Sequence, residues 1–172
     1  SSPYDSPTPI SGWFDNEASI TASVTSPWLD TGTRYVCTGW DGTGSIPPSG
    51  TGSSVTFTIT QPSTITWKWK TQHYLTVRTD PSGIATIPGE GWYDYLTNVP
   101  LTAPSVGGFE FLNWDVDGTT KPGNPIQVPM DTPHTATAHY KRLPAMPVGG
   151  YSISLTQQTP VSHITVYMML IA

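Results

Sequence analysis

The sequence predicts an all-β protein with two tandem small β-sandwich-like modules and a C-terminal β-strand tail. Three observations support this prediction. Valine, isoleucine, phenylalanine and tryptophan alternate with threonine and lysine over much of residues 55–77, which is the period-two pattern of strands with one buried face. Blocks of sequence recur in the same order in the two halves of the chain. No stretch has the apolar spacing of an amphipathic helix.

The internal repeat sets the predicted domain organisation. Its three longest blocks are 9–15 with 88–94, 35–41 with 109–115, and 55–70 with 126–141. A unit of about 70 to 80 residues used twice is typical of tandem arrays. We therefore predict a first module at 1–72, a second module at 73–142, and a linker and tail at 143–172.

Local composition predicts the elements of the first module. In chain order they are an irregular proline-containing segment at 1–11, a turn at 12–16, strands at 19–25 and 33–40, a loop rich in glycine, proline and serine at 41–52, and a β-hairpin at 54–70. Four tryptophans occupy equivalent places in the two modules, and one cysteine lies on an alternating strand. The predicted core residues are accordingly Trp13, Trp40, Trp92, Trp114 and Cys37.

The second module begins with a strand that the first module lacks. Residues 73–79 alternate Leu75 and Val77 with polar side chains. The Gly-Trp-aromatic-Asp block recurs 79 residues later, from Trp13 to Trp92, so the matching strand of the first module would fall before Ser1. A β-module short of one strand exposes unpaired backbone groups and an apolar slot unless another segment fills them.

The tail carries a candidate for that missing strand. Residues 162–166, Ser-His-Ile-Thr-Val, resemble residues 72–77, Gln-His-Tyr-Leu-Thr-Val. In donor-strand pairing, main-chain hydrogen bonds supply affinity and alternate side chains fill pockets. The predicted partner-binding residues are Tyr151, Ile153, Leu155, Ile164, Val166, Met168 and Leu170.

Composition limits the classes of function. Charged residues make up 11% of the chain, the net charge is −5 and no basic patch is present, so nucleic acid is not a predicted partner. The single cysteine excludes an internal disulfide. A chain rich in threonine and serine and poor in lysine fits an extracellular, cell-surface protein. Because the chain does not begin with Met, we expect a processed protein or a fragment.

Few residues suggest chemistry. Asp115 and Asp117, followed by Gly118, resemble the start of a calcium loop but lack its remaining ligands, so a polar turn is the favoured interpretation. No nucleophile motif or phosphate-binding loop is present, and we predict no enzymatic activity and no cofactor. The histidines have no metal-ligand spacing and are predicted to lie on the surface; they are His73, His134, His139 and His163.

Two tryptophans are candidates for contact with cell-surface glycans. Trp28 has no counterpart in the second module, and Trp67 corresponds to Ala138 in the repeat. An exposed indole can stack on a sugar ring, although a core position is favoured for Trp67.

Several blocks resemble a known family. The Gly-Trp-[Phe/Tyr]-Asp motif, the Tyr-Val-Cys-Thr-Gly-Trp-Asp motif at 35–41 and the long alternating run are similar to the divergent internalin B-type repeats of archaeal and bacterial surface proteins, over residues 5–141. The resemblance implies compact β-modules with adhesive or structural roles. The start of the tail also resembles the segment before a C-terminal anchor in archaeal surface proteins, but the apolar run at 164–172 is too short to span a bilayer.

We therefore predict a structural subunit of a pilus-like surface filament, assembled from copies of itself by donor-strand complementation. Two other interpretations stay open. One is a fragment of a membrane-anchored adhesin or surface-layer repeat protein, with an anchor beyond Ala172. The other is a carbohydrate-binding module.

Overall fold

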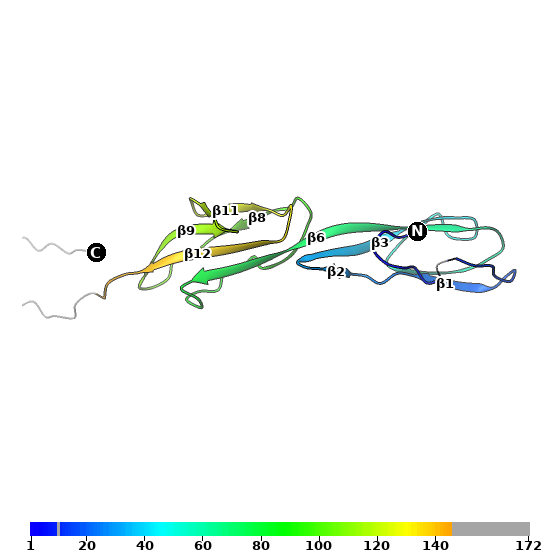
Figure 1. The fold of residues 1–172 in the computed structure, drawn as a ribbon, viewed down its shortest axis with the longest axis horizontal. Coiled ribbons are helices and arrows are strands. Elements are labelled where there is room, and N and C mark those ends of the chain that lie inside the picture. Colours follow the sequence, from blue (N-terminus) through cyan, green and yellow to red (C-terminus); the bar gives the residue numbers. More distant parts are fainter. Residues whose placement is uncertain (10, 146–172) are drawn as a thin grey trace, which may run out of the picture.

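The computed structural model describes residues 1–9 and 11–145, which form an elongated rod of β-strands with no helix among them (Figure 1). The predicted all-β class is confirmed. The strands are β1 (Ser19–Ser23), β2 (Trp28–Asp30), β3 (Thr33–Thr43), β4 (Ser49–Thr51), β5 (Ser54–Thr58), β6 (Thr64–Asp80), β7 (Gly91–Asp94), β8 (Asn98–Leu101), β9 (Phe109–Val116), β10 (Thr119–Lys121), β11 (Ile126–Pro129) and β12 (His134–Arg142). Within the described part of the chain, no helix is long and apolar enough to cross a membrane.

The strand β6 runs along most of the rod and belongs to both of its halves (Figure 1). Its first half pairs antiparallel with β3, and its second half, from Leu75, pairs parallel with β12. The residues predicted as a separate strand at 73–79 are therefore the second half of one continuous strand of 17 residues. The predicted boundary between residues 72 and 73 lies inside this strand. We use "first module" for β1–β5 with the first half of β6, and "second module" for the remainder.

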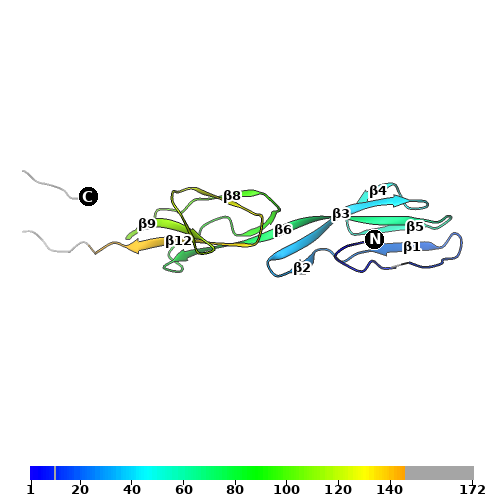
Figure 2. The same cartoon turned by 45° about the horizontal axis from the view of Figure 1, so that its top comes forward.

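In the first module, β1 and β5 form a two-stranded sheet that packs over β3 and β6 (Figure 2). Buried side chains from both layers meet in one cluster, including Ala22, Val55, Cys37, Trp40 and Trp67. The predicted hairpin at 54–70 is wrong, because β5 and β6 lie in different sheets. Their apolar faces point into the same core from opposite sides, so each strand pairs sideways with another partner. Trp40 and Cys37 are buried, as predicted.

The second module repeats this arrangement. β8 and β11 form its two-stranded sheet, and β9 and β12 pair antiparallel beneath it, as β3 and β6 do in the first module. Register shifts by one residue at matching places, so that Thr38 and Leu112 are the extra residues of β3 and β9, each two positions before a buried tryptophan. This bulge explains why Leu112 is exposed. The largest fully buried side chains of the second module are Trp114, Leu75, Leu101, Met130 and Val128.

The modules meet through close contacts as well as through β6. Gly32, at φ +67°, lies so close to Pro133 that an added Cβ would be 2.8 Å from the proline Cβ. The Arg34 guanidinium lies 4.6 Å from the centre of the Trp92 ring. The Arg34 Nε also donates to the Gln72 side chain, at 2.7 Å, and Gln72 in turn donates to Asp94 of β7. Side chains of β3, β6 and β7 are thus tied together across the junction.

Candidate functional site

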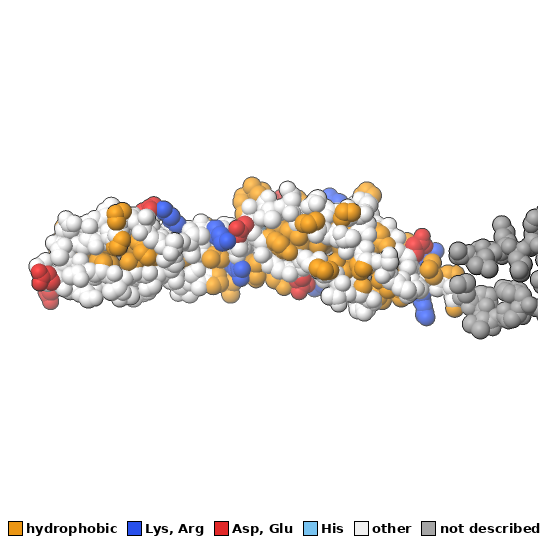
Figure 3. Space-filling model, turned by 180° about the vertical axis from the view of Figure 1, so that it is seen from behind, with side chains coloured by type: hydrophobic (Ala, Val, Ile, Leu, Met, Phe, Trp, Pro, Cys, Tyr) orange, Lys and Arg blue, Asp and Glu red, His pale blue; other side chains and the backbone are white. Residues whose placement is uncertain are grey.

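An open groove lies along the first module. Its volume is about 620 Å³, and it is lined by apolar side chains of both layers and by the segment that precedes β1. Ile20 and Phe57 contribute from β1 and β5, Ile65 contributes from β6, and Trp13 and Phe14 contribute from the preceding segment. Most of this lining is apolar or uncharged, and the charged side chains on the face in Figure 3 are few and scattered. The groove therefore suits an apolar, uncharged occupant.

The backbone edge of β6 beside this groove forms two hydrogen bonds with Ser1. The Ser1 ammonium group donates to the Ile65 carbonyl oxygen at 2.6 Å, and the Trp67 N–H donates to the Ser1 carbonyl oxygen at 3.2 Å. A residue that bonds to positions 65 and 67 in this way pairs with the intervening residue, Thr66, in the pattern of a parallel sheet. Within residues 1–9 and 11–145, Ser1 is the only residue that forms backbone hydrogen bonds with this edge at positions 64–69. The remaining positions can accept a parallel strand.

The second module shows what occupies the same place when the strand is present. β12 is the counterpart of the first half of β6. One edge of β12 pairs with β9, and the other edge pairs parallel with residues 75–80 of β6. Leu75 of that strand is fully buried at the centre of the second core, and Val77 packs against the same core. Glu90 accepts a hydrogen bond from the Val77 N–H on the strand's other side. The groove in the first module is the place that Leu75 and Val77 fill in the second.

Two of the predicted core tryptophans, Trp13 and Trp92, lie outside the buried clusters, whereas Trp67 is buried, the position favoured for it from the sequence. Trp13 is fully exposed at the groove, although its place in the repeat predicted a core position. Trp67, one of the two glycan candidates, is buried, as is its counterpart Ala138, so it cannot stack on a ligand. Trp28 remains about one-third exposed and adjoins Tyr4, which stacks on Tyr35 with ring centres 3.8 Å apart. The structure therefore does not bring Trp28 and Trp67 together as a binding face.

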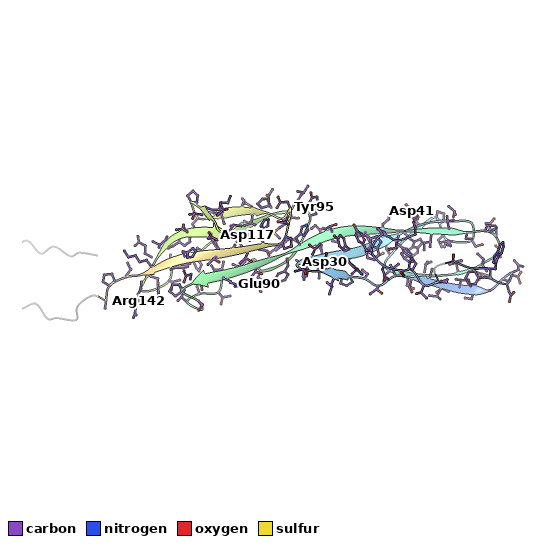
Figure 4. The ribbon with its side chains drawn as sticks, in the orientation of Figure 1. Asp30, Asp41, Glu90, Tyr95, Asp117 and Arg142 are labelled. Atoms are coloured by element: carbon purple, nitrogen blue, oxygen red, sulfur yellow. The ribbon has the colours of Figure 1, made fainter. Side chains whose placement is uncertain are left out.

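The calcium candidates hold a turn and a histidine. Asp115 accepts a hydrogen bond from the Gly118 N–H at 2.8 Å, which closes the turn between β9 and β10. Asp117, at φ +51° and labelled in Figure 4, accepts from the Thr135 N–H and bonds to the His134 Nδ1. Three of the four carboxylate oxygens therefore act in hydrogen bonds within the chain. Among the described residues, no group of three or more His, Cys, Asp or Glu side chains is arranged to hold a metal ion.

His134 lies between two carboxylates at the edge of the second module. Its Nε2 is 2.9 Å from Asp131, opposite the nitrogen that bonds to Asp117. Burial alone would lower the pKa of His134, but the hydrogen bonds to both carboxylates outweigh burial and raise this pKa above its ordinary value. The hydrogen bond from His134 lowers the pKa of Asp131. The two charge-assisted hydrogen bonds of His134 connect the loop before β12 to the β9–β10 turn.

The other histidines differ in their surroundings. His73 is buried at the module junction, where it bonds to Thr33, so its predicted surface position is wrong. Burial lowers the pKa of His73, and repulsion from His134 lowers it further. His139 is half-buried and bonds to Asp80 at 2.9 Å. His163 lies outside the described residues, as do the tail residues predicted to bind a partner: Tyr151, Ile153, Leu155, Ile164, Val166, Met168 and Leu170.

The comparison with family models decides what the second module resembles. Residues 74–144 match the divergent InlB B-repeat domain. The match supports the resemblance inferred from the motifs, although it covers only the second of the two modules. The InlB B-repeat family is found in bacterial surface proteins. Searches of curated proteins and of solved structures found no match.

The limits of the B-repeat match bear on the groove. The match begins at Tyr74, within β6, and continues beyond the end of β12. A B-repeat unit in this chain therefore includes the second half of β6 as its first strand. The first module has counterparts of β8 to β12, but residues 12–15, which correspond to β7, form no strand, and in the described residues only Ser1 lies at the position of the first strand.

The open groove lies where the sequence predicts an apolar slot, but the sequence does not predict that Trp13 and Phe14 line it. The useful signal was the position of the Gly-Trp-aromatic-Asp block directly after the missing strand. In the second module this block is β7, which pairs with residues 72–75 of β6. In the first module, where the described residues include no such strand, Trp13 of this block is left exposed.

Proposed function

We propose that this protein is an extracellular structural subunit of a surface filament, in which the tail of one molecule completes the first module of the next. The observation that carries the proposal is the open groove beside the edge of β6, at the place that Leu75 and Val77 occupy in the second module. The B-repeat match supports a surface location, and we propose a structural role without catalysis and without a nucleic-acid partner.

The direction of the strands favours a neighbour over the chain's own tail. The slot accepts a strand parallel to β6, and β12 also runs parallel to β6. The chain leaves β12 near Arg142, at the end of the rod opposite to the first module (Figure 4). In a head-to-tail row of molecules with one orientation, the tail enters the next groove already running in the required direction.

The length of the linker favours the same arrangement. The 17 residues of β6 span about 55 Å at roughly 3.3 Å per residue, and Arg142 lies beyond its end. The nine steps from Arg142 to Tyr151 reach at most about 32 Å when fully extended. Residues 151–155 therefore cannot reach the groove of their own molecule. Residues 161–168 could reach it only when nearly fully extended, and they would then need a further reversal of direction.

The hydrophobic effect supplies the driving force for insertion. Alternate tail residues, among them Ile164, Val166 and Met168, are apolar. Burial of such a side chain contributes about 1.5 to 3 kcal/mol relative to exposure in water. A tail that binds a groove on a different molecule makes a heterologous contact, which propagates as a fibre when the rotation does not close a ring.

Charge substitutions on the two faces of the tail strand test the proposal in the full-length chain. Ile164→Asp should abolish filaments in electron micrographs, because it places a carboxylate in the apolar groove. Thr165→Asp adds the same charge on the alternate face and should leave filaments intact. A chain without residues 148–172 should stay unassembled, and added peptide 151–172 should bind to it. Filaments that persist in Ile164→Asp or in the deleted chain would refute donor-strand assembly.

A second candidate is a longer anchored adhesin or surface-layer protein in which residues upstream of Ser1 supply the strand. The parallel hydrogen bonds of Ser1 favour this candidate, because a preceding segment could continue along β6 from that residue. The intact mass of the protein purified from its source distinguishes the two. A mass that requires residues before Ser1, together with particles that do not polymerise, would favour the second candidate.

A further inference from the structure

The segment that precedes β1 presents two aromatic side chains to solvent beside the groove. Trp13 is fully exposed and Phe14 is about two-fifths exposed, and both line the groove together with residues 63–65 of the β6 edge. A solvent-exposed tryptophan next to an exposed phenylalanine is the kind of apolar surface that marks an interaction site. Neither side chain belongs to the buried cluster of the first module.

The repeat identifies what these side chains are placed to contact. Residues 12–15, Gly-Trp-Phe-Asp, correspond to residues 91–94, Gly-Trp-Tyr-Asp, which form β7. β7 pairs antiparallel with β6, from Gln72 opposite Asp94 to Leu75 opposite Gly91. This pairing is on the side of the strand that faces away from β12. In the second module, the first strand is thus held between β12 and β7.

The counterpart of Trp13 closes over that strand. The Trp92 ring meets the Tyr74 ring edge-on, with centroids 5.2 Å apart, and Trp92 is half-buried. Tyr74 is the residue before Leu75, so Trp92 covers the strand where its apolar side chain enters the core. Trp13 has the same position in the repeat, but the described residues include no strand for it to cover.

We propose that residues 12–15 form the second wall of the acceptor groove, where they pair antiparallel with residues 161–164 of another copy and Trp13 packs over His163. This inference rests on the proposed filament function and names the residues that hold the donor. The donor strand lies between the β6 edge and residues 12–15, as the second half of β6 lies between β12 and β7.

The sequence of the tail sets the register. Ile164-Thr165-Val166 matches Leu75-Thr76-Val77, which places Ile164 and Val166 in the groove and His163 at the position of Tyr74. In the same register the residue after Val166 takes the position opposite Thr66 that Ser1 occupies. The donor therefore displaces the two hydrogen bonds of Ser1 and replaces them with its own.

Trp13→Ala in the full-length chain tests the second wall, with Trp28→Ala as the matched control at a tryptophan outside the groove. Trp13→Ala should raise the critical concentration for polymerisation, measured by sedimentation, by tenfold or more, since a buried interface tryptophan commonly contributes that much to affinity. It should leave the melting temperature of the unassembled protein unchanged, because Trp13 makes no core contact. Trp28→Ala should leave the critical concentration unchanged.

A second variant tests the register. His163→Ala should weaken polymerisation, and the double variant should lose less than the two single changes predict together, because both remove one contact. Independent effects of the two changes would overturn the pairing of Trp13 with His163. If Trp13→Ala polymerises at the wild-type critical concentration, or if its unassembled form melts at a lower temperature, residues 12–15 do not form a second wall of the groove. Either result would leave the filament proposal itself intact. A wild-type chain that does not polymerise would instead refute the proposed function, and this inference with it.

Discussion

Replacement of Trp114 by alanine should destabilise the protein by about 2 to 4 kcal/mol. Trp114 is 0% exposed and lies at the centre of the second core, edge-on to Phe111 and opposite Ala138 of β12. Truncation of a buried large aromatic side chain typically costs about 3 to 5 kcal/mol. The indole Nε1 is buried without a hydrogen-bond partner among the described residues, and burial of this unpaired N–H destabilises the fold. Its removal therefore offsets about 1 kcal/mol of the loss.

Urea unfolding followed by far-ultraviolet circular dichroism measures this loss. Trp114→Phe keeps most of the ring volume and removes the unpaired N–H, so it should cost only about 1 kcal/mol. Trp28→Ala, at a partly exposed site, is the control for loss of a tryptophan as such. A loss below about 1 kcal/mol for Trp114→Ala would refute the argument that this residue holds the two layers of the second module together.

Three further predictions concern charge, backbone and chemistry. The folded-state pKa of His134 is raised, so its stabilisation is present below the unfolded pKa and is lost as the pH rises through the folded pKa. His134→Gln should therefore cost more stability at about pH 5.5 than at about pH 8.5 in thermal melts. His73, whose pKa is lowered, makes stability rise with pH in the wild type and in the variant alike. Gly32→Ala should lower stability more than Gly52→Ala, because both glycines have positive φ but only Gly32 lies against Pro133. Hydrolase screens with glycans, esters and peptides should give no turnover, and reproducible turnover by the purified chain would contradict the non-enzymatic assignment.

The longer strands of this fold could be predicted from the sequence because their apolar and polar residues alternate. The three-residue strands β2, β4 and β10 are too short to show alternation, and β4 lies within the predicted loop at 41–52. The periodic runs at 33–40 and 64–70 match observed strands, and Trp40 and Trp114 are buried as expected. Alternation identifies a strand and its apolar face, but it carries no information about the neighbour with which the strand pairs. For this reason the sequence predicts a hairpin at 54–70, where the structure has a connection between two different sheets.

Exposure of the repeated tryptophans could not be predicted from their repetition. Trp13 and Trp92 occupy matching blocks, yet Trp92 packs against the second half of β6, whereas residues 1–9 and 11–145 contain no strand against which Trp13 packs. For Trp67, the small counterpart Ala138 made contact with a ligand an alternative to the favoured core position. Both sites are buried, because Trp67 stands opposite Trp40 on β3 as Ala138 stands opposite Trp114 on β9. A bulky and a small residue can therefore occupy equivalent core positions when the surrounding layers differ in volume.

The shared strand also determines how the rod responds to tension. A pull along the long axis passes from one module to the other through the covalent backbone of β6, rather than across a surface of side chains. The ladders of β6 with β3 and with β12 run along the same axis, so their hydrogen bonds are loaded together in shear. Under load, either module can extend only after several of these bonds break at once, and the junction between them contains no linker that could stretch first.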